Sequence, residues 1–485
     1  MAVRAAGSRL LAGAAVLAVM LGSGAQAETL REALIAAYQS NPSLTGARAG
    51  QRAVDEGVPL AKSEGRPALF GQGSYTENVV PSSNSFLSPD RQLAGGVELS
   101  VPIYSGGAVR SAVRAAIDRV EAGRANLRAT ESAVFSAVVA AYMDVIRNEA
   151  VVDLNTANVN VLSVNLQATS DRFEIGDLTR TDVAQSEARL SLARADLASA
   201  RANLIRARER YIELVGHAPG TLEAPPPLPG LPDSPDTAVT AALDSNPDLI
   251  AAREAAQAAK ADIGSARATR LPQLDGFAQG STVNFLDSLG STVPGVSADQ
   301  TADAAAVGVR ATIPIFQGGR PGALVRRSQA QLAQAQEREI EVERNVIAQT
   351  RAAWSSWQAA LQLIESSERA VSANRLSLEG VRAENTVGNR TILDILDAEQ
   401  ELLNTQVRLV SARRDAYVAG FTLLAAMGKA EARDLALDGG ALYDPVVNYQ
   451  RVKGQWLDWS DDIEPVPVAT RTIDSSAQNA DSSAK

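Results

Sequence analysis

The sequence predicts a mainly α-helical fold with long coiled-coil helices and four β-strands, built twice from one repeating unit. The stretch at residues 173–190 returns at residues 385–402, with Gly176 and Gly388 at the same place, 212 residues apart. Before each copy of this stretch the sequence has segments in which apolar and polar residues alternate. A helical run of about 65 residues lies between these alternating segments and the copy. A repeat of this size predicts an internal duplication over nearly the whole chain.

The first residues predict a secretory signal peptide. Two arginines precede an apolar run at residues 10–21, and an Ala-Gln-Ala cleavage pattern follows. We therefore predict that residues 1–27 are removed and that the mature chain begins at Glu28. The formal net charge is −10 before this removal, and the loss of two arginines makes it more negative. We expect no nucleic acid as a partner of such an acidic, exported chain.

The sequence has no cysteine and a single histidine, His217. The lack of cysteine excludes disulfides, thiolate metal sites, cysteine nucleophiles and a lipid anchor on cysteine. His217 lies beside a Pro-Gly turn, where a lone histidine is far more often solvated than catalytic. The recurring carboxylates lie at predicted helix starts rather than beside a base. We therefore expect no enzyme, no metal and no cofactor.

Each repeat begins with helical sequence and continues into strands. The first repeat is predicted at residues 28–236 and the second at residues 237–428. Helical segments are expected at residues 30–64 and 237–270, and each contains an Asn-Pro pair. Two strand hairpins follow, and apolar and polar residues alternate most clearly in the second strand of each. The four predicted strands are residues 68–79, 93–103, 273–285 and 307–315.

Two very long helices follow the matched turns VPIYSGG and IPIFQGG. They are predicted at residues 108–173 and 320–384, and at 1.5 Å per residue each is about 100 Å long. The chain then turns at Gly176 or Gly388 and returns as a helix of about 38 residues.

The two return helices have the clearest periodicity in the sequence. Apolar residues alternate at spacings of three and four from Val183 to Leu214, and again from Ile395 to Ala426. A period of 3.5 residues predicts coiled-coil packing. A return helix and the next half's first helical segment together match one long helix in length. We therefore expect short helices stacked end to end beside the long ones, with the Pro-rich connector at residues 222–235 at the junction.

The end of the chain lies outside the duplication. Residues 429–460 are predicted to form a C-terminal segment at the middle, or equator, of the helical body. Residues 461–485 are polar and aperiodic, and we expect them to be disordered.

The strands are the part of the mature chain that we expect to cross a membrane. After Glu28 the sequence has no uncharged apolar run of about 18 residues, which a membrane-spanning helix needs. Four strands are too few to close a barrel, so the chain must oligomerise. Two copies would supply eight strands and three would supply twelve. Glu98 and Arg310, at equivalent positions of the polar face, would line the lumen.

The repeated motifs resemble the TolC-type outer-membrane efflux channel family, in its unacylated branch. The resemblance rests on the two Asn-Pro helices, on VPIYSGG and IPIFQGG, and on the tip motifs at residues 172–183 and 386–404. It implies a homotrimer with one shared twelve-stranded barrel among outer-membrane lipid, continuous with an α-helical tunnel through the periplasm. It also implies docking to an inner-membrane pump or ABC exporter through a periplasmic adaptor protein.

The tip carboxylates have two interpretations. Asp394 and Asp397 lie three residues apart near a helix start, and the resemblance implies that they form carboxylate rings at a periplasmic constriction. The alternative is helix capping, with Thr391 and Asp394 as a capping box. Both interpretations are compatible.

The resemblance also implies a clasp that holds the gate closed. Arg390 would contact Thr181 and Asp182 of the other hairpin, or it is only an exposed arginine near a turn, where an ion pair contributes about 0 to 1 kcal/mol. Asn385 stands where the family often has a tyrosine in the closing network. The expected adaptor contact is the tip surface, although the glycines could serve the turn alone. The contact residues would be Ile175, Gly176, Leu178, Val387 and Gly388.

One other class of protein fits part of the sequence. A structural coiled-coil protein of the periplasm or cell surface would need the helices but no strands. Heat-modifiable migration on a gel separates that class from a channel. Within the channel class, multidrug efflux and type I protein secretion stay open, and a deletion strain tested for detergent sensitivity and for loss of a secreted protein distinguishes them.

Overall fold

A computed structural model describes residues 27–80, 89–291, 295–437 and 442–480. The predicted signal peptide lies outside the described residues except for Ala27, as do residues 481–485 of the predicted disordered tail. The elements, in chain order, are α1 (Leu30–Ser40), α2 (Pro42–Asp55), α3 (Gly57–Ser63), β1 (Ala68–Glu77), β2 (Arg91–Tyr104), α4 (Ala108–Glu174), α5 (Arg180–Val215), α6 (Pro235–Ser245), α7 (Pro247–Ala268), β3 (Gln273–Asn284), β4 (Thr301–Thr312), α8 (Arg320–Thr386), α9 (Ile392–Ala426) and α10 (Pro445–Val452).

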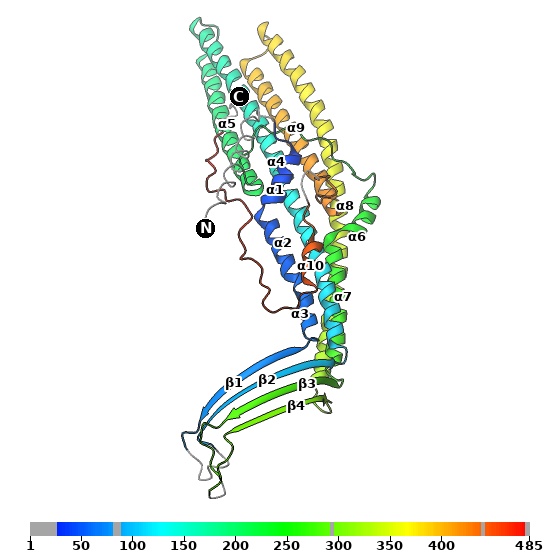
Figure 1. The fold of residues 1–485 in the computed structure, drawn as a ribbon. Helices are drawn as coiled ribbons and strands as arrows, with labels where there is room; N and C mark the ends of the chain where they lie inside the picture. Colours follow the sequence, from blue (N-terminus) through cyan, green and yellow to red (C-terminus); the bar gives the residue numbers. More distant parts are fainter. Residues whose placement is uncertain (1–26, 81–88, 292–294, 438–441, 481–485) are drawn as a thin grey trace, which may run out of the picture.

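The helices form a long body with the sheet at one end and two helix tips at the other (Figure 1). Helices α4 and α5 form one antiparallel hairpin, and α8 and α9 form the second. The long helices α4 and α8 have 67 residues each, so each is about 100 Å long as predicted. Near the sheet, α4 packs against α2, α3 and α7, and α8 packs against α7. The short helices therefore accompany the long ones.

The coiled-coil seam of α5 follows the predicted heptad. Seven of its seam residues are buried: Ser186, Leu190, Ala193, Ala200, Leu204, Ala207 and Tyr211. In α9 only part of the predicted seam is buried, and a second row of buried residues appears at Leu396, Glu399 and Leu403. The second row exists because α9 packs against α4 of the first hairpin as well as against α8.

The first helical segment of each half is broken at its Asn-Pro pair. Residues 30–64 form three helices rather than one continuous helix, and the break before α2 is at Asn41. The Asn41 side chain accepts from the N–H of Ser43 at 3.0 Å, and its amide donates to the carbonyl of Leu214 at 2.9 Å. Pro42 fits the first helical position because no N–H is needed there.

The second half repeats this arrangement at Asn246. Its side chain caps α7 by accepting from Asp248 N–H at 3.0 Å, and its amide donates to the Ala426 carbonyl at 2.9 Å. In both halves, therefore, the Asn-Pro motif breaks the first helical segment and attaches the break to the return helix near its C-terminal end.

The strands form one antiparallel sheet in the order β1-β2-β3-β4. The predicted extent of the fourth strand, residues 307–315, is wrong at both ends, because β4 runs from Thr301 to Thr312. Its first residue pairs with Asn284 and its last with Gln273, which are the two ends of β3. Residues 313–315 continue the apolar alternation but lie beyond the end of β3. The hydrogen-bonding partner therefore sets the strand's length.

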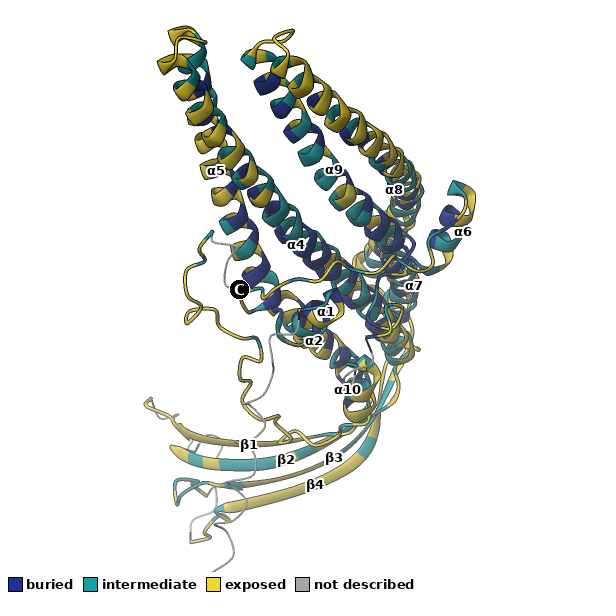
Figure 2. Cartoon of the chain, turned by 90° about the horizontal axis from the view of Figure 1, so that it is seen from above, coloured by how far each residue is buried: buried dark blue, intermediate teal, exposed yellow. Residues whose placement is uncertain are grey.

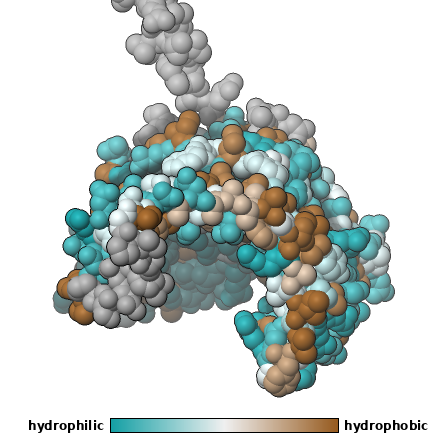
Figure 3. All heavy atoms as spheres, turned by 60° about the horizontal axis from the view of Figure 1, so that its bottom comes forward, coloured by the Kyte–Doolittle hydropathy of each residue, from teal (hydrophilic) through white to brown (hydrophobic). Residues whose placement is uncertain are grey.

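The two faces of the sheet differ in polarity. Residues paired across antiparallel strands point to the same face, so the register places Leu69, Val97, Leu99, Ala278 and Val307 together on one apolar face. Figure 3 brings this end forward and shows hydrophobic and hydrophilic residues around a hollowed side of the molecule. Apolar residues of this face are exposed, which a soluble sheet would avoid.

The main hydrophobic core lies where the helices meet. It is built around the fully buried Phe135, Tyr142, Tyr211 and Phe421, with contributions from α1, α4, α5 and α9. By length and composition alone, α4 also has an 18-residue stretch apolar enough to cross a membrane, but half of that stretch is buried in the protein. We therefore interpret this stretch as part of a helix in the protein core.

The predicted mature N-terminus is anchored to the connector. The Glu28 N–H donates to the Thr221 carbonyl at 2.7 Å, and the Glu223 N–H donates to the Glu28 carbonyl at 3.0 Å. The hydroxyl of Tyr142 donates to both the Glu28 and the Glu223 carbonyls. Three segments distant in sequence are therefore joined at one point in the core.

Residues 461–480 contain no helix or strand. The segment begins with an ion pair between Arg451 and Asp462 at 2.7 Å and ends beside α5, where Arg208 donates to the Asn479 carbonyl at 2.8 Å. The disorder expected of this tail stays a prediction.

Candidate functional site

The two hairpin tips share one turn geometry. Gly176 and Gly388 have φ of +84° and +81°, a conformation that glycine adopts at little cost. In the first tip the Asp177 N–H donates to the Arg172 carbonyl at 2.9 Å, and the second tip has the same six-residue closure. Both turns therefore end their long helix with a left-handed cap.

An ion pair spans each turn. In the first tip Arg172 and Asp177 are 2.7 Å apart, and in the second Arg390 Nε and Glu384 Oε2 are 2.7 Å apart. The Glu384 carboxylate raises the pKa of Arg390. The Asn385 amide donates to the Arg390 carbonyl at 2.7 Å, so Asn385 helps to hold this turn.

Both return helices begin with a capping box. The Thr391 N–H donates to Asp394 Oδ2 at 2.9 Å, and the Asp394 N–H donates to Thr391 Oγ1 at 3.3 Å. Thr179 and Asp182 make the same pair of bonds at the start of α5. These bonds lower the pKa of Asp394 and of Asp182. The predicted capping role of Thr391 and Asp394 is confirmed.

Asp397, the second predicted ring carboxylate, has a partner on the other hairpin. It accepts a hydrogen bond from the guanidinium of Arg189 in α5. Both Asp394 and Asp397 are partly exposed, with 38% and 57% of their side chains accessible. One chain therefore presents two partly exposed carboxylate side chains close to its tip.

The expected contact from Arg390 to Thr181 and Asp182 is not made within one chain. Arg390 pairs with Glu384, and Asp182 pairs with Thr179. The two tips also diverge from each other, and exposed residues cover both of them (Figure 2). The clasp stays a prediction for tips on neighbouring copies.

The sequence analysis missed a buried polar contact that joins the hairpins below the tips. Glu399 in α9 is almost fully buried and accepts from the Asn165 amide of α4 at 3.0 and 3.1 Å. Arg382 of α8 donates to the same carboxylate at 2.9 Å. The feature of the sequence that points to Glu399 is its alignment with Glu187 in the repeat.

The predicted adaptor surface presents apolar groups at both tips. Ile175 and Val387 occupy equivalent positions, and 80% and 70% of these residues are exposed. Leu178 is half-buried, and Gly176 and Gly388 are both exposed. Each tip therefore exposes one large apolar side chain, and the adaptor contact stays a prediction.

At the opposite end, Glu98 and Arg310 share one face of the sheet. Glu98 is aligned with Gln279 and through it with Ala306, and Arg310 lies four residues further along β4. The Arg310 guanidinium lies 5.1 Å from the centre of the Phe277 ring. This face is the more polar of the two, as the sequence predicted.

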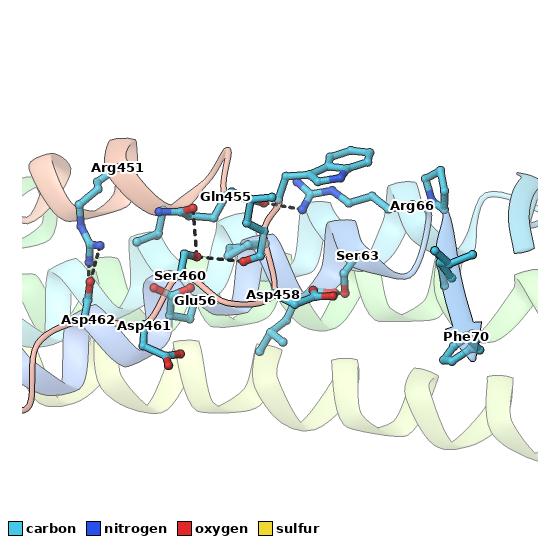
Figure 4. A pocket seen from close by; sticks show the side chains of 18 residues that line it. Glu56, Ser63, Arg66, Phe70, Arg451, Gln455, Asp458, Ser460, Asp461 and Asp462 are labelled. Carbon is cyan, nitrogen blue, oxygen red and sulfur yellow. Dashed lines mark hydrogen bonds and ion pairs between the residues drawn. The ribbon is translucent and has the colours of Figure 1, made fainter. Parts of the chain in front are cut away.

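A groove lies between the two ends of the molecule, and the C-terminal segment forms part of its lining. It has a volume of about 900 Å³ and lies where residues 455–462 cross α3 and the start of β1 (Figure 4). Arg66 donates to the Gln455 carbonyl and stacks on Trp456, with 4.8 Å from its guanidinium carbon to the ring centre. Among the described residues, no group of three or more His, Cys, Asp or Glu could hold a metal ion.

Comparison with known proteins identifies the family. A model of the outer membrane efflux protein family matches residues 33–217 and 238–429. The chain is 36% identical over 453 residues to outer membrane efflux protein BepC of Brucella suis, over 92% of this chain and 96% of that protein. It is 26% identical over 438 residues to outer membrane protein TolC of Escherichia coli K12, over 87% and 86%.

A solved structure also matches the fold. The crystal structure of the outer membrane protein VceC from Vibrio cholerae aligns with a TM-score of 0.70 and 23% identity, covering 82% of this chain and 96% of that one. The chain belongs to the outer membrane efflux protein family.

Proposed function

We propose that three copies of the chain form a passive exit channel for export across the outer membrane. The observation that favours this most is the joining of two features in one chain. A sheet with an exposed apolar face and two unpaired edge strands is continuous with helices about 100 Å long. Edge strands cannot remain unpaired in a lipid bilayer, so the sheet needs further copies.

Three copies would supply twelve strands and enclose a lumen. The face of Glu98 and Arg310 would line that lumen, and the face of Leu69, Val97 and Val307 would contact lipid. The helical hairpins would continue the barrel as a tunnel on the periplasmic side of the membrane. A channel of this kind needs no cofactor, because it conducts solutes without catalysing a reaction.

The helix tips would close the tunnel. Asp394 and Asp397 from each copy would form two carboxylate rings, which attract cations at a narrow point. Arg390 would contact Thr181 and Asp182 of a neighbouring copy and hold the tips together. Asn385 would support this closure by holding the backbone of Arg390.

Opening would depend on a partner at the tips. The exposed Ile175 and Val387, with Leu178 and the tip glycines Gly176 and Gly388, would meet a periplasmic adaptor. The adaptor would connect the channel to an inner-membrane pump or ABC exporter. An exposed clasp of ion pairs is worth about 0 to 1 kcal/mol per pair, which is weak enough for an adaptor to release.

Single-channel conductance in a planar bilayer tests the proposal. We expect small, cation-selective openings from the purified protein, larger openings from Arg390→Ala, and reduced cation selectivity from Asp394→Ala with Asp397→Ala. A folded trimer that conducts no ions would instead favour a structural coiled-coil protein.

A further inference from the structure

We propose that a basic groove between α4 and α7, where the helices join the sheet, binds the phosphate group of an anionic phospholipid in the periplasmic leaflet of the outer membrane. The basic groove is defined by four cationic side chains: Arg110, Arg114, Lys260 and Arg267. The inference rests on the proposed channel, which places the membrane around the sheet, and it adds a lipid site on the channel's outer surface.

The basic groove has a volume of about 670 Å³ and lies between the first turns of α4 and the last turns of α7. None of the described residues that line it is acidic. The two helices lie close together here, because a Cβ at Gly264 of α7 would overlap Oγ of Ser111 in α4. The cations therefore surround a narrow contact of small residues, where a compact headgroup fits better than a protein side of the same charge.

The four cations are not neutralised by the protein. None of them forms an ion pair or a side-chain hydrogen bond with another described residue. On α4 the first acid, Asp118, comes one turn after Arg114. The acid of α7 that is nearest in sequence, Asp262, pairs with Arg119 instead. Such a groove attracts an anion, and guanidinium groups match the geometry of phosphate oxygens.

The charge at this end of the helices is opposite to the charge of the whole chain. The formal net charge of the sequence is −10. In α8, which packs against α7, three arginines precede the first acid, Glu337. They are Arg320, Arg326 and Arg327. Cations therefore gather where the helices meet the sheet, which is the level at which the phosphates of a bilayer would lie.

The basic groove faces away from the proposed tunnel. Arg110, Arg114 and Arg124 belong to one row of α4 residues that are spaced alternately by four and three, so they share one face of the helix. The guanidinium carbon of Arg124 lies 4.9 Å from the centre of the Tyr449 ring in α10. Inside a tunnel, α10 and the segment after it would block the passage. The face that they cover is therefore the outer one.

Neighbouring copies in the proposed trimer would leave the basic groove open. Helix α4 packs against α3 and α7, and α7 packs against α8. This order matches the strand order β1-β2-β3-β4, so α4 and α7 are the inner pair of helices at this level. Neighbouring copies would meet at the outer elements, which leaves the groove accessible to lipid.

Exposed tryptophans lie at the same level. A Cβ at Gly65 would lie 3.0 Å from Cγ1 of Val109, so the end of α3 is beside the start of α4. The next residue, Arg66, stacks on Trp456, and both Trp456 and Trp459 are largely exposed. Tryptophan is enriched at the boundary between membrane and water. This level therefore suits lipid headgroups.

A phospholipid would use two adjoining surfaces. Its phosphate would lie on the cations of the basic groove, and its acyl chains would continue along the exposed apolar face of the sheet, which begins beside it. A free phosphate ion would use the cations alone. The proposal therefore assigns the groove to a lipid headgroup and predicts that the acyl chains contribute to binding.

Native mass spectrometry of the delipidated protein tests the site. The probes are phosphatidylglycerol and phosphatidylcholine with the same acyl chains, and the test variant combines Arg114→Gln with Lys260→Gln. We expect the wild type to bind phosphatidylglycerol more tightly than phosphatidylcholine. Each cation near an anionic lipid contributes about a factor of five in affinity, so the variant should bind phosphatidylglycerol about 25-fold more weakly. Its binding of phosphatidylcholine should not change.

Two control variants separate the site from general charge. Arg194→Gln with Arg201→Gln removes the same charge from the exposed surface of α5, away from the sheet, and should bind phosphatidylglycerol as the wild type does. Arg114→Lys with Lys260→Arg keeps both charges and should retain most of the binding. An excess of inorganic phosphate should displace little of the lipid, because it gains nothing from the sheet.

The outcomes separate the lipid site from the channel. Equal binding of the two lipids by the wild type, or an equal loss in the α5 control, would overturn the lipid site, and a trimeric mass with ion conductance in the same sample would leave the channel in place. Full displacement by inorganic phosphate would overturn the assignment to a lipid. Selective binding that only the groove variant loses, in a protein that is monomeric and does not conduct, would support the groove and overturn the channel.

Discussion

Arg189 of α5 and Asp397 of α9 form an ion pair that joins the two helical hairpins near their tips. Both side chains are partly exposed, so the pair contributes at most about 1 kcal/mol. It connects the two hairpins, which would move apart if the channel opens at its tips as proposed. It also places a positive charge beside one of the proposed ring carboxylates.

We expect Arg189→Ala to open more readily, because this link is lost. A loss of about 1 kcal/mol would raise the open probability by up to about fivefold in bilayer recordings. Cation selectivity should also rise, because Asp397 is no longer neutralised. Arg194→Ala, on the exposed surface of the same helix, should leave both quantities unchanged. Equal effects of the two substitutions would show that the Arg189–Asp397 contact is irrelevant to gating.

Glu399→Gln tests the buried contact below the tips. The substitution keeps the size of the side chain but removes the charge that Asn165 and Arg382 share. Hydrogen bonds to charged groups contribute about 1.5–3 kcal/mol, and the exposure of Arg382 places the loss near the lower end. We expect faster hydrogen exchange in α9 around residue 399 and a more frequent open state.

Glu187→Gln is the matched control for this prediction. Glu187 is the repeat counterpart of Glu399 but is exposed on α5. Its substitution should leave the exchange rates of the tip helices unchanged. If Glu399→Gln behaves like this control, the buried carboxylate does not couple the hairpins.

The sequence predicted those features that depend on one segment. The heptads of α5, the length of α4 and the capping box of Thr391 each follow from local spacing, and the structure has all three. The sequence showed that the Asn-Pro pairs repeat, but it did not show that they break the helix there. The break is fixed by the hydrogen bond from the Asn amide to a return helix that is distant in the sequence.

Contacts between the hairpins could not be predicted in this way. Glu399 is buried because α9 packs against two helices at once. The heptad pattern of α9 indicates only one of these two contacts. Similarly, β4 ends at Thr312 because β3 ends opposite it, although the alternation continues to Ile315. Periodicity shows which face of a helix or strand is apolar. Which other helix or strand packs against that face depends on the tertiary structure.

Tyr142→Phe should loosen the junction of the mature N-terminus with the connector. The hydroxyl donates to the Glu28 carbonyl at 2.8 Å and to the Glu223 carbonyl at 2.7 Å. The Glu28 carbonyl keeps its bond from the Glu223 N–H at 3.0 Å, so the substitution removes the hydroxyl's bond to the Glu223 carbonyl, a loss of about 0.5–1.5 kcal/mol. We expect faster thermolysin cleavage in the connector at residues 222–235. Tyr417→Phe is the control, because it removes a hydroxyl from another part of the same core and should not change the cleavage rate. If it also speeds cleavage, a general loss of core stability is the cause, not the Tyr142 hydrogen bonds.

The half-buried carboxylate of Glu131 should give the chain a pH-dependent stability. Burial raises the pKa of Glu131, which accepts the Ala432 N–H at 2.6 Å, and burial also raises the pKa of Glu431 beside Arg128. For an acid with a raised pKa in the folded state, folding is favoured by protonation. This contribution is complete below the ordinary pKa of 4.5 and is lost as the pH rises through the folded value.

Glu131→Gln removes the titration and keeps an oxygen that accepts the Ala432 N–H. We expect this variant to match or exceed the wild type in urea resistance at pH 7.5, and its advantage should shrink toward pH 5. Other carboxylates, including Asp182 and Asp394 with their lowered pKa values, titrate in both proteins, so the difference between the two curves reports Glu131 together with its interaction with Glu431. Glu131→Ala leaves the N–H unpaired and should be less stable than the glutamine variant at every pH. Parallel curves for the wild type and Glu131→Gln would mean that Glu131 has the same pKa in the folded and unfolded chains.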